Sequence, residues 1–333
     1  MSRRLFLVLL LIAAVTFSTF AGGQSEGQMA PGQADLEEER YAMVVFLKGS
    51  EFFNWSYAGM RDAAKAIGPH VKVELQGPAE WDATLEARAV DQLVARQVDG
   101  IVVTAGDAAT LVPSIDRAID SDIPVVTFDS DAPDSNRLAF VGTNNYAAGY
   151  RAGETMVEWL DGEGHIGVST FPGPDHLRQR VDGFRQAIED AGADIEISVV
   201  NDEGDVAKAE TQLTALLQAN PDINGIFGAH GNPGPGAASA VNTLNMGDQV
   251  DIMAFDFGAP VIELIESGDI RGTVGQNPYL MGYMAMLLAY SANHPTEVAS
   301  GKAPFGHVPD NVDTGVSILG EEEVQMYKDP PTF

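Results

Sequence analysis

Short apolar runs alternate along this chain with longer segments whose apolar residues recur every three or four positions. The apolar runs fall at 42–47, 101–103, 124–128, 165–169, 195–200, 225–228 and 252–255. The helix-like segments fall at 56–67, 84–96, 112–121, 147–160, 179–191, 206–218, 236–244 and 260–267. Continuous apolar runs are typical of strands that helices cover on both faces. The pattern therefore predicts an α/β protein built from doubly wound parallel sheets.

One order of elements occurs twice. Residues 86 to 131 run through a helix, a short strand, a polar turn, a second helix and a strand that ends in Phe128-Asp129. Residues 209 to 258 repeat this order and end in Phe255-Asp256. The two Phe-Asp pairs are 127 positions apart. This distance along the chain is too long for a solenoid repeat and suits two similar α/β lobes. We therefore expect two lobes that each end a buried strand on an aromatic residue and a carboxylate.

The repeated Phe-Asp pair is a candidate ligand site, because ligands of open parallel sheets bind outside the carboxyl ends of the strands. A ring beside a carboxylate suits a polyhydroxylated ligand, which has an apolar C–H face and an edge of hydroxyl groups. The alternative is that both phenylalanines are core residues and that both aspartates cap the following helices. Because the pair is duplicated, we favour a ligand cleft between the lobes.

The first 40 residues lie outside the α/β pattern. Two arginines precede an apolar run from Leu5 to Val15, and small residues stand near Ala21, as is typical of a secretory signal peptide over residues 1–21. An uncleaved membrane anchor is the alternative, although the apolar run is short for a span. Residues 22–40 are rich in Gly, Gln and Glu and predict a flexible linker. Lipoprotein attachment needs a cysteine, and the chain has none, so we expect a periplasmic protein without a lipid anchor.

The composition excludes several classes of function. Without cysteine the chain has no disulfides, thiol nucleophiles or thiolate metal sites. The chain has 48 Asp and Glu against 19 Lys and Arg, a formal charge of -29, and such a surface repels nucleic acid. The acidic run from Asp129 lacks the later Gly and Glu of a calcium loop, and no hydrolase motif occurs. We therefore expect no metal, no cofactor and no catalytic residues.

Several motifs, taken together, resemble a known family. They are Phe52-Phe53 before a helix, Val98-Asp99-Gly100, Ile123 to Asp129, Gly142 to Asn145, Arg178 to Phe184 and Phe255-Asp256. In this order and spacing they resemble the periplasmic sugar-binding proteins of ABC transporters, of the ribose-binding type, whose fold is shared by the effector domains of LacI-like repressors. The resemblance runs from about Tyr41 to about Ser317.

The resemblance implies two lobes that are joined by three crossing segments and close on a sugar or polyol. It implies a first lobe of residues 41–143 and 277–305 and a second lobe of residues 144–276 and 306–333. It also implies a monomeric binding protein, not an enzyme, that delivers its ligand to an ABC permease in the membrane. The implied ligand-binding residues are Ser50, Phe52, Phe53, Asp129, Arg180, His230, Phe255, Asp256 and Gln276.

Three departures from the ribose-type pattern bear on the ligand. Ser130 follows the first-lobe aspartate where that pattern has Arg, His230 stands where it has Asn, and no aromatic residue stands near Gly204. We therefore do not expect ribose itself. Two alternatives to an importer component stay open: a sensory binding protein that presents its ligand to a chemoreceptor or kinase, and an exported glycoside-acting enzyme, since two carboxylates suffice for that chemistry.

Overall fold

The computed structural model describes residues 36–173, 175–295, 297–298, 301–302, 308–329 and 331–332. The expected signal peptide and most of the expected linker lie outside these residues. The last two linker positions belong instead to the first strand, β1 (Glu39–Val44). The compact unit described below begins at Glu38. In the described part of the chain, no helix has the length and apolar character needed to cross a membrane.

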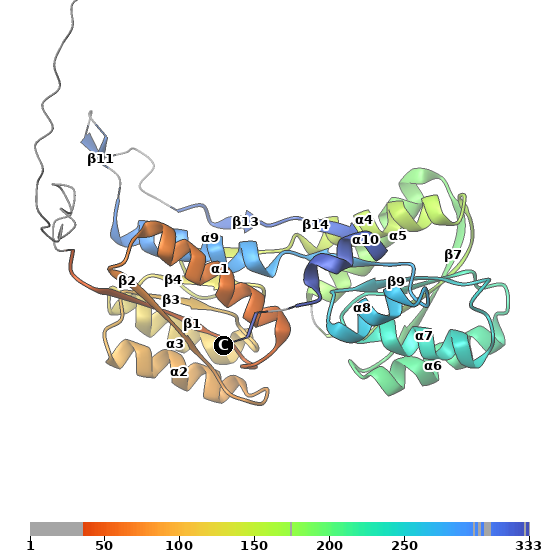
Figure 1. Ribbon diagram of the computed structural model, residues 1–333, viewed down its shortest axis with the longest axis horizontal. Helices are drawn as coiled ribbons and strands as arrows, with labels where there is room; N and C mark the ends of the chain where they lie inside the picture. Colours follow the sequence, from red (N-terminus) through yellow and green to blue (C-terminus); the bar gives the residue numbers. More distant parts are fainter. Residues whose placement is uncertain are drawn as a thin grey trace, which may run out of the picture. The chain divides into compact units, whose positions relative to one another are not determined.

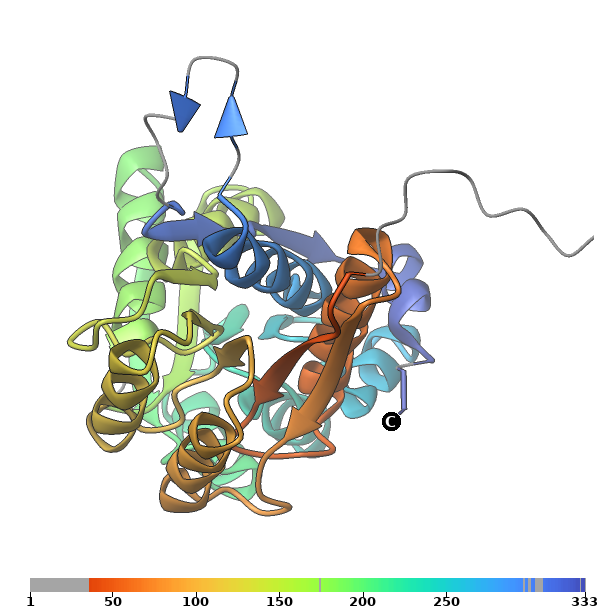
Figure 2. The same cartoon turned by 90° about the vertical axis from the view of Figure 1, so that its left-hand side faces the viewer.

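The first lobe is a six-stranded sheet between two layers of helices. Helices α1 and α9 cover one face and α2 and α3 cover the other (Figures 1 and 2). All paired strands run parallel in the order β13-β5-β4-β3-β1-β2. Its other elements are β2 (Val71–Gln76), β3 (Gly100–Val103), β4 (Val125–Phe128), β5 (Ala139–Gly142), β13 (Asn311–Asp313), α1 (Glu51–Ile67), α2 (Ala83–Ala95), α3 (Ala108–Asp120) and α9 (Pro278–Asn293).

The second lobe repeats this plan with strand order β14-β10-β9-β8-β6-β7, in which only the edge strand β14 is antiparallel among the described residues. Helices α4 and α5 cover one face, and α6, α7 and α8 cover the other (Figure 1). The predicted architecture of two doubly wound lobes is confirmed. Its elements are β6 (Glu163–Thr170), β7 (Asp194–Asn201), β8 (Gly225–Gly228), β9 (Asp251–Phe255), β10 (Gly272–Gln276), β14 (Val316–Leu319), α4 (Asn145–Trp159), α5 (Asp175–Ala191), α6 (Val206–Ala219), α7 (Pro233–Thr243), α8 (Ala259–Glu266), α10 (Glu321–Val324) and the 3-10 helix η1 (Gln325–Tyr327); a separate hairpin joins β11 (Glu297–Val298) to β12 (Gly301–Lys302).

Three segments cross between the lobes and are hydrogen-bonded to one another. Helices α4 and α9 follow the first two crossings, and each is capped at its start by an asparagine, Asn144 and Asn277. The third crossing lies at Thr314-Gly315, between β13 and β14. Asp313 accepts from the backbone N–H groups of Asn144 (3.1 Å) and Gly315 (2.9 Å), which ties the first and third crossings together.

The position of the third crossing corrects the expected lobe boundary. We expected the chain to enter the second lobe at residue 306. Strand β13 instead pairs with β5 in the first sheet, so the chain leaves the first lobe only after Asp313. The expected boundary between residues 305 and 306 itself lies outside the described residues.

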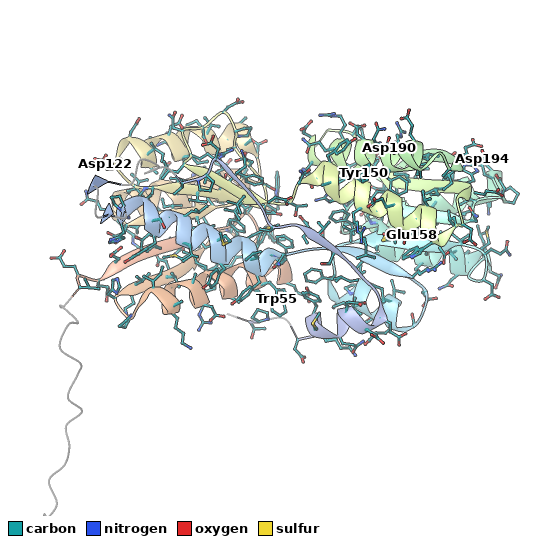
Figure 3. All side chains as sticks on the ribbon, turned by 90° about the horizontal axis from the view of Figure 1, so that it is seen from above. Trp55, Asp122, Tyr150, Glu158, Asp190 and Asp194 are labelled. Carbon is teal, nitrogen blue, oxygen red and sulfur yellow. The ribbon has the colours of Figure 1, made fainter. Side chains whose placement is uncertain are left out.

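Each lobe is held together on one face by two helices that pack backbone against backbone. A Cβ atom added at Gly282 of α9 would lie 1.8 Å from the carbonyl oxygen of Ser56 on α1. In the second lobe, a Cβ atom at Gly149 of α4 would lie 1.8 Å from the carbonyl oxygen of Arg180 on α5. Tyr150 of α4 also donates a 3.1 Å hydrogen bond to Asp190 of α5 (Figure 3). Glycine is therefore required where the crossing helices dock.

The glycine contacts predict a large cost for one methyl group. Gly282→Ala should lower the free energy of unfolding by about 1–3 kcal/mol, because overpacking against a backbone carbonyl outweighs the better helix propensity of alanine. Urea unfolding followed by circular dichroism measures the change. Gly247→Ala is the matched control, since a Cβ atom there meets no other atom within 4 Å. Equal stability of the two variants would contradict the close packing.

Candidate functional site

The two repeated aspartates adopt the same unusual backbone conformation. Asp129 follows β4 with a φ of 60°, and Asp256 follows β9 with a φ of 63°, both in the left-handed region that few residues other than glycine enter. The N–H group of Asp129 donates to Val141 of the neighbouring strand at 3.0 Å, and that of Asp256 donates to Val274 at 2.9 Å. Neither residue caps a helix. The backbone turns both carboxylates out of the sheet edge and into adjoining cavities.

The phenylalanines before these aspartates are core residues, as the alternative to a ligand role proposed. Phe128 and Phe255 have no exposed surface and belong to the cores under α1 and α4. Phe255 also lies outside the residues that line the cavities around the aspartates. The expectation that Phe255 forms the ligand wall is therefore wrong. Its ring instead supports Arg180, whose guanidinium carbon lies 3.7 Å from the ring centre.

Arg180 reaches the site from α5 with part of its hydrogen-bonding capacity already used. Nε donates to Oδ1 of Asn145 at 2.8 Å, and Nη1 donates to the carbonyl of Ala229 at 3.0 Å. The side chain is 5% exposed, and among the described residues Nη2 has no hydrogen-bond partner. Burial lowers the pKa of Arg180 to about 10, against the raising effect of Asp256 and Asp129. The guanidinium stays charged at neutral pH and keeps donors for a ligand.

Asp129 and Asp256 face each other's charge across the cleft. Burial raises the pKa of Asp129 to about 7, and the negative charge of Asp256 raises it further against the lowering effect of Arg180. Burial likewise raises the pKa of Asp256, and Arg180 opposes this shift. Thr104 donates to Asp129 at 3.3 Å. Burial thus shifts both carboxyl groups toward their protonated form, and at Asp129 the charge of Asp256 adds to this effect.

Gln276 connects the second-lobe carboxylate to the crossings. Its Nε2 donates to Asp256 at 2.9 Å, and its Oε1 accepts from the hydroxyl of Thr143 at 2.7 Å. Thr143 precedes α4 at the first crossing, and Gln276 ends β10 at the second. The position of Asp256 is therefore tied to the first and second crossings.

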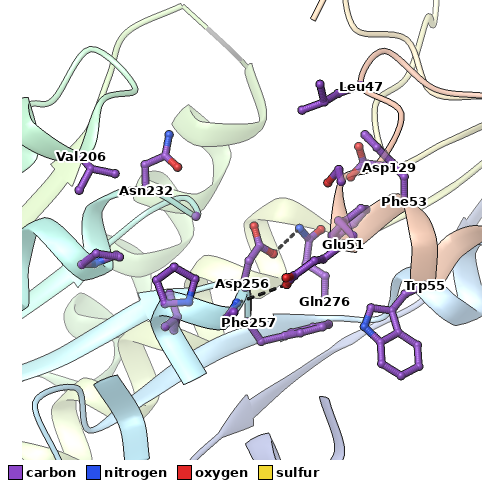
Figure 4. A pocket seen from close by; sticks show the side chains of 18 of the residues that line it. Leu47, Glu51, Phe53, Trp55, Asp129, Val206, Asn232, Asp256, Phe257 and Gln276 are labelled. Atoms are coloured by element: carbon purple, nitrogen blue, oxygen red, sulfur yellow. Dashed lines mark hydrogen bonds between the residues drawn. The ribbon is translucent and has the colours of Figure 1, made fainter. Parts of the chain in front are cut away.

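The first-lobe wall of the cavity is aromatic. Ser50, Phe52 and Phe53 lie at the start of α1 and line a cavity of about 620 Å³ that Asp129, Asp256 and Gln276 also line (Figure 4). Phe53 is only 3% exposed and packs edge-on against Phe52 at 5.5 Å. Adjoining cavities of about 900 and 930 Å³ share Asp129 with this one. The volumes are in the range of small-molecule sites.

His230 lies in the cavity wall, but neighbouring groups engage both of its ring nitrogens. Nε2 is 3.0 Å from each carboxylate oxygen of the buried Asp202, and the N–H of Asn232 approaches Nδ1 at 3.4 Å. Ser169 and the N–H of Gly204 also donate to Asp202, and these bonds lower the pKa of that carboxyl against the effect of burial. His230 therefore joins two loops of the second lobe and presents mainly its ring carbons to the cavity.

The structure adds residues to the cavity walls that were not among the implied ligand-binding residues. Phe171, after β6, packs edge-on against His230 at 5.2 Å and lies 3.3 Å from where a Cβ atom at Gly204 would be. An aromatic ring thus fills the space left by the absent aromatic residue near Gly204. Phe46, Trp81 and Asn145 also line the cavity. Trp81 and Phe171 stand in irregular segments and Asn145 at a helix start, whereas Phe46 belongs to the predicted apolar run 42–47 but lies beyond the end of β1 at Val44.

Among the described residues no group of three or more His, Asp or Glu side chains is placed to hold a metal ion. Asp131, the second acid of the Asp129-Ser130-Asp131 run, is paired with Arg137. The free donors of Arg180 and the carboxylate acceptors of Asp129 and Asp256 suit an organic ligand with several hydroxyl groups.

Comparisons with known proteins agree with the two-lobed fold. The family model described as periplasmic binding protein domain matches residues 41–294. The chain is 25% identical over 329 residues to a D-ribose/D-allose-binding protein of Pseudomonas aeruginosa, which covers 96% of this chain and 98% of that protein. A sugar-binding protein of a sugar ABC transporter from Bacillus halodurans superposes with a TM-score of 0.81, 33% identity and coverage of 87% of this chain and 100% of that chain. AraP, an arabinose-binding protein from Geobacillus stearothermophilus, superposes with a TM-score of 0.82, 31% identity and coverage of 87% and 99%. All of these relatives are named as binding proteins.

The raised pKa of Asp129 predicts how its substitution changes stability with pH. Between about pH 4 and pH 7 the folded chain holds this proton and the unfolded chain releases it, so the contribution of Asp129 to stability falls as pH rises. The free energy of unfolding of Asp129→Asn, relative to that of wild type, should therefore increase by about 1–2 kcal/mol between about pH 4 and pH 8. This magnitude allows for screening by solvent, because the side chain is partly exposed. Urea unfolding at several pH values measures it.

Asp134→Asn is the matched control, because Asp134 is an exposed carboxylate in the same loop. Its stability relative to wild type should show no such increase. If the difference in unfolding free energy between Asp129→Asn and wild type also stayed constant with pH, Asp129 would not be buried near the negative charge of Asp256 as described.

Proposed function

We propose that this chain, which belongs to the periplasmic binding protein family, captures a monosaccharide or related polyol in the cleft between its lobes. The observation that carries the proposal is the meeting of Asp129 from the first lobe with Asp256 and Arg180 from the second around adjoining cavities. Aromatic rings flank these charged groups on both sides of the cleft. The resemblance to sugar-binding proteins of the ribose type, drawn from the sequence, is confirmed by the family match and the relatives.

The chemistry of a sugar matches this set of groups. Each hydroxyl both donates and accepts, a carboxylate only accepts, and a guanidinium only donates. Ionised Asp129 and Asp256 would therefore accept hydrogen bonds from sugar hydroxyl groups, while Arg180 would donate to hydroxyl or ring oxygens. Hydrogen bonds to charged groups contribute about 1.5–3 kcal/mol each, so three such groups together are enough for about micromolar binding. The rings of Phe52, Phe53 and Phe171 would cover the C–H faces of the ligand.

The charges at the cleft favour a neutral ligand. The positive charge of Arg180 acts on both aspartates. The ribose-type pattern has a second arginine directly after the first-lobe aspartate, and this chain has Ser130 there. The next arginine along, Arg137, is already paired with Asp131. A carboxylate or phosphate on the ligand would meet Asp129 and Asp256 without a cation left to neutralise it.

We propose further that the chain acts outside the cytoplasm and delivers its ligand to an ABC importer. The three crossings allow the lobes to pivot, and a ligand that contacts both walls favours the arrangement that holds it. Both lobes then present a defined surface to a membrane permease. The expected signal peptide of residues 1–21 supports export, and the chain needs no cofactor for this role.

A thermal-shift screen against neutral monosaccharides and polyols tests the function. The screen should include D-ribose, D-allose, arabinose and xylose, and at least one compound should raise the midpoint by several degrees when it is in large excess over its Kd. Arg180→Ala should weaken binding of that compound by about 10- to 100-fold, since it removes hydrogen bonds from a charged donor.

Arg178→Ala is the matched control on the same helix. Arg178 is exposed and pairs with Asp175 and Asp182 on its own helix, so its loss should leave affinity unchanged. A wild-type chain that binds no neutral sugar or polyol, and carries none after purification when the denatured sample is analysed by mass spectrometry, would contradict the proposed function.

Binding of a neutral sugar should also weaken in acid. The sugar hydroxyls donate to ionised Asp129, so protonation of this group competes with the ligand. With a pKa of about 7 in the empty cleft, affinity should be about tenfold lower at pH 6 than at pH 8. Isothermal titration across this range measures the effect. An affinity independent of pH would show that Asp129 does not accept from the ligand in its ionised form.

A further inference from the structure

An aromatic cluster joins the end of the chain to both lobes. Tyr327, at the end of η1, lies with its ring centre 4.1 Å from that of Phe257 in the second lobe. On its other side the ring of Trp55, on α1 of the first lobe, approaches edge-on at 6.0 Å. We call Trp55, Phe257 and Tyr327 the interlobe latch. A ring from the C-terminal segment is thus clamped between residues of two lobes.

The C-terminal segment is anchored to the second lobe. Val324 is fully buried in the core beside α8, and Lys328 pairs with Glu266 at the end of that helix. Gln325 donates to the same glutamate at 2.7 Å. Tyr327 therefore moves with the second lobe when the lobes pivot, and its contact with Trp55 is the part of the latch that can open.

The first-lobe side of the latch is the beginning of α1. Trp55 is half-buried and packs against the core of the second lobe, although its helix belongs to the first (Figure 3). One turn earlier, Glu51 accepts from the N–H of Ala259 at 3.3 Å, at the N-terminus of α8, where a carboxylate is favoured. Glu51, Trp55 and Phe257 also line the cavity that Asp129 and Asp256 share (Figure 4).

We propose that the interlobe latch sets the affinity of the cleft by favouring the lobe arrangement that holds the ligand. In the latched arrangement Asp129 and Asp256 line one cavity, as two-sided binding of a ligand requires. The contact between Trp55 and Tyr327 is apolar and lies outside the polar crossings, so it adds attraction between the lobes without contacting the crossings. The effect on affinity rests on the proposed function, whereas the ring contact itself does not.

The test uses the full mature chain with Trp55 as its single tryptophan, made with Trp81→Phe and Trp159→Phe. Tyr327→Ala in this background should shift the Trp55 emission to longer wavelength, because the indole loses its ring contact and gains solvent. In a chain that keeps all three tryptophans, Tyr327→Ala should raise the Kd for whichever of D-allose, arabinose, xylose and D-ribose binds by about three- to tenfold, mainly through faster dissociation. Tyr327→Phe should restore both values, since it keeps the ring.

Met326→Ala is the matched control, because Met326 is 69% exposed and adjacent in sequence. An unchanged emission in Tyr327→Ala would overturn the ring contact. A shifted emission with an unchanged or lower Kd would overturn the role in affinity. If residues 22–333 with all three natural tryptophans bind no neutral monosaccharide or polyol, the proposed function fails and the affinity role with it, while the emission still decides whether the ring contact exists.

Discussion

Two carboxylates and one guanidinium share the cleft, and removing each of them from water costs free energy that the surrounding structure has to offset. Arg180 is held by the oxygen of Asn145, the carbonyl of Ala229 and the ring of Phe255. Asp256 is held by Gln276. These contacts fix where the charges lie before any ligand arrives, so the ligand needs little reorganisation of the protein. Burial still leaves the charged form of Asp129 poorly solvated, as its raised pKa shows. Hydroxyl donors of a ligand would offset this cost by hydrogen bonding to the carboxylate.

The same contacts couple the site to the crossings. Gln276 and Thr143 sit on two different crossings and are hydrogen-bonded to each other, and Gln276 reaches Asp256. Asn145, which positions Arg180, follows the first crossing directly. Both charged groups of the second lobe are therefore oriented by residues at the crossings. Under the proposed function, a ligand that engages them would act on the relative position of the lobes as well as on the second-lobe wall.

Most of the fold could be predicted from the sequence, because buried parallel strands leave continuous apolar runs. The elements missed lack that signal for physical reasons. Strand β2 is an edge strand whose apolar residues alternate with polar ones, and β10 (Gly272–Gln276) contains two glycines. Helix α9 is apolar on almost every side, as the sequence Pro278 to Ala289 shows, so it has no helical periodicity to detect. The third crossing was misplaced because β13 is only three residues long.

The site could be predicted in part. The duplicated Phe-Asp pairs located both carboxylates, because equal positions in two similar lobes point to one cleft. The sequence could not show that Phe255 faces inward under Arg180 while Asp256 turns out, since this depends on a left-handed backbone at one residue. It also could not pair His230 with Asp202 or place Phe171 beside Gly204, because these contacts join the ends of three different strands.

The most direct test of the central claim is a crystal structure of the mature chain grown with the sugar or polyol that binds it. We expect one ligand molecule between the first-lobe phenylalanines and the second-lobe wall. Its hydroxyl groups should lie within hydrogen-bonding distance of Asp129, Asp256 and Nη2 of Arg180. A ligand bound elsewhere, or one that contacts only one lobe, would contradict the account.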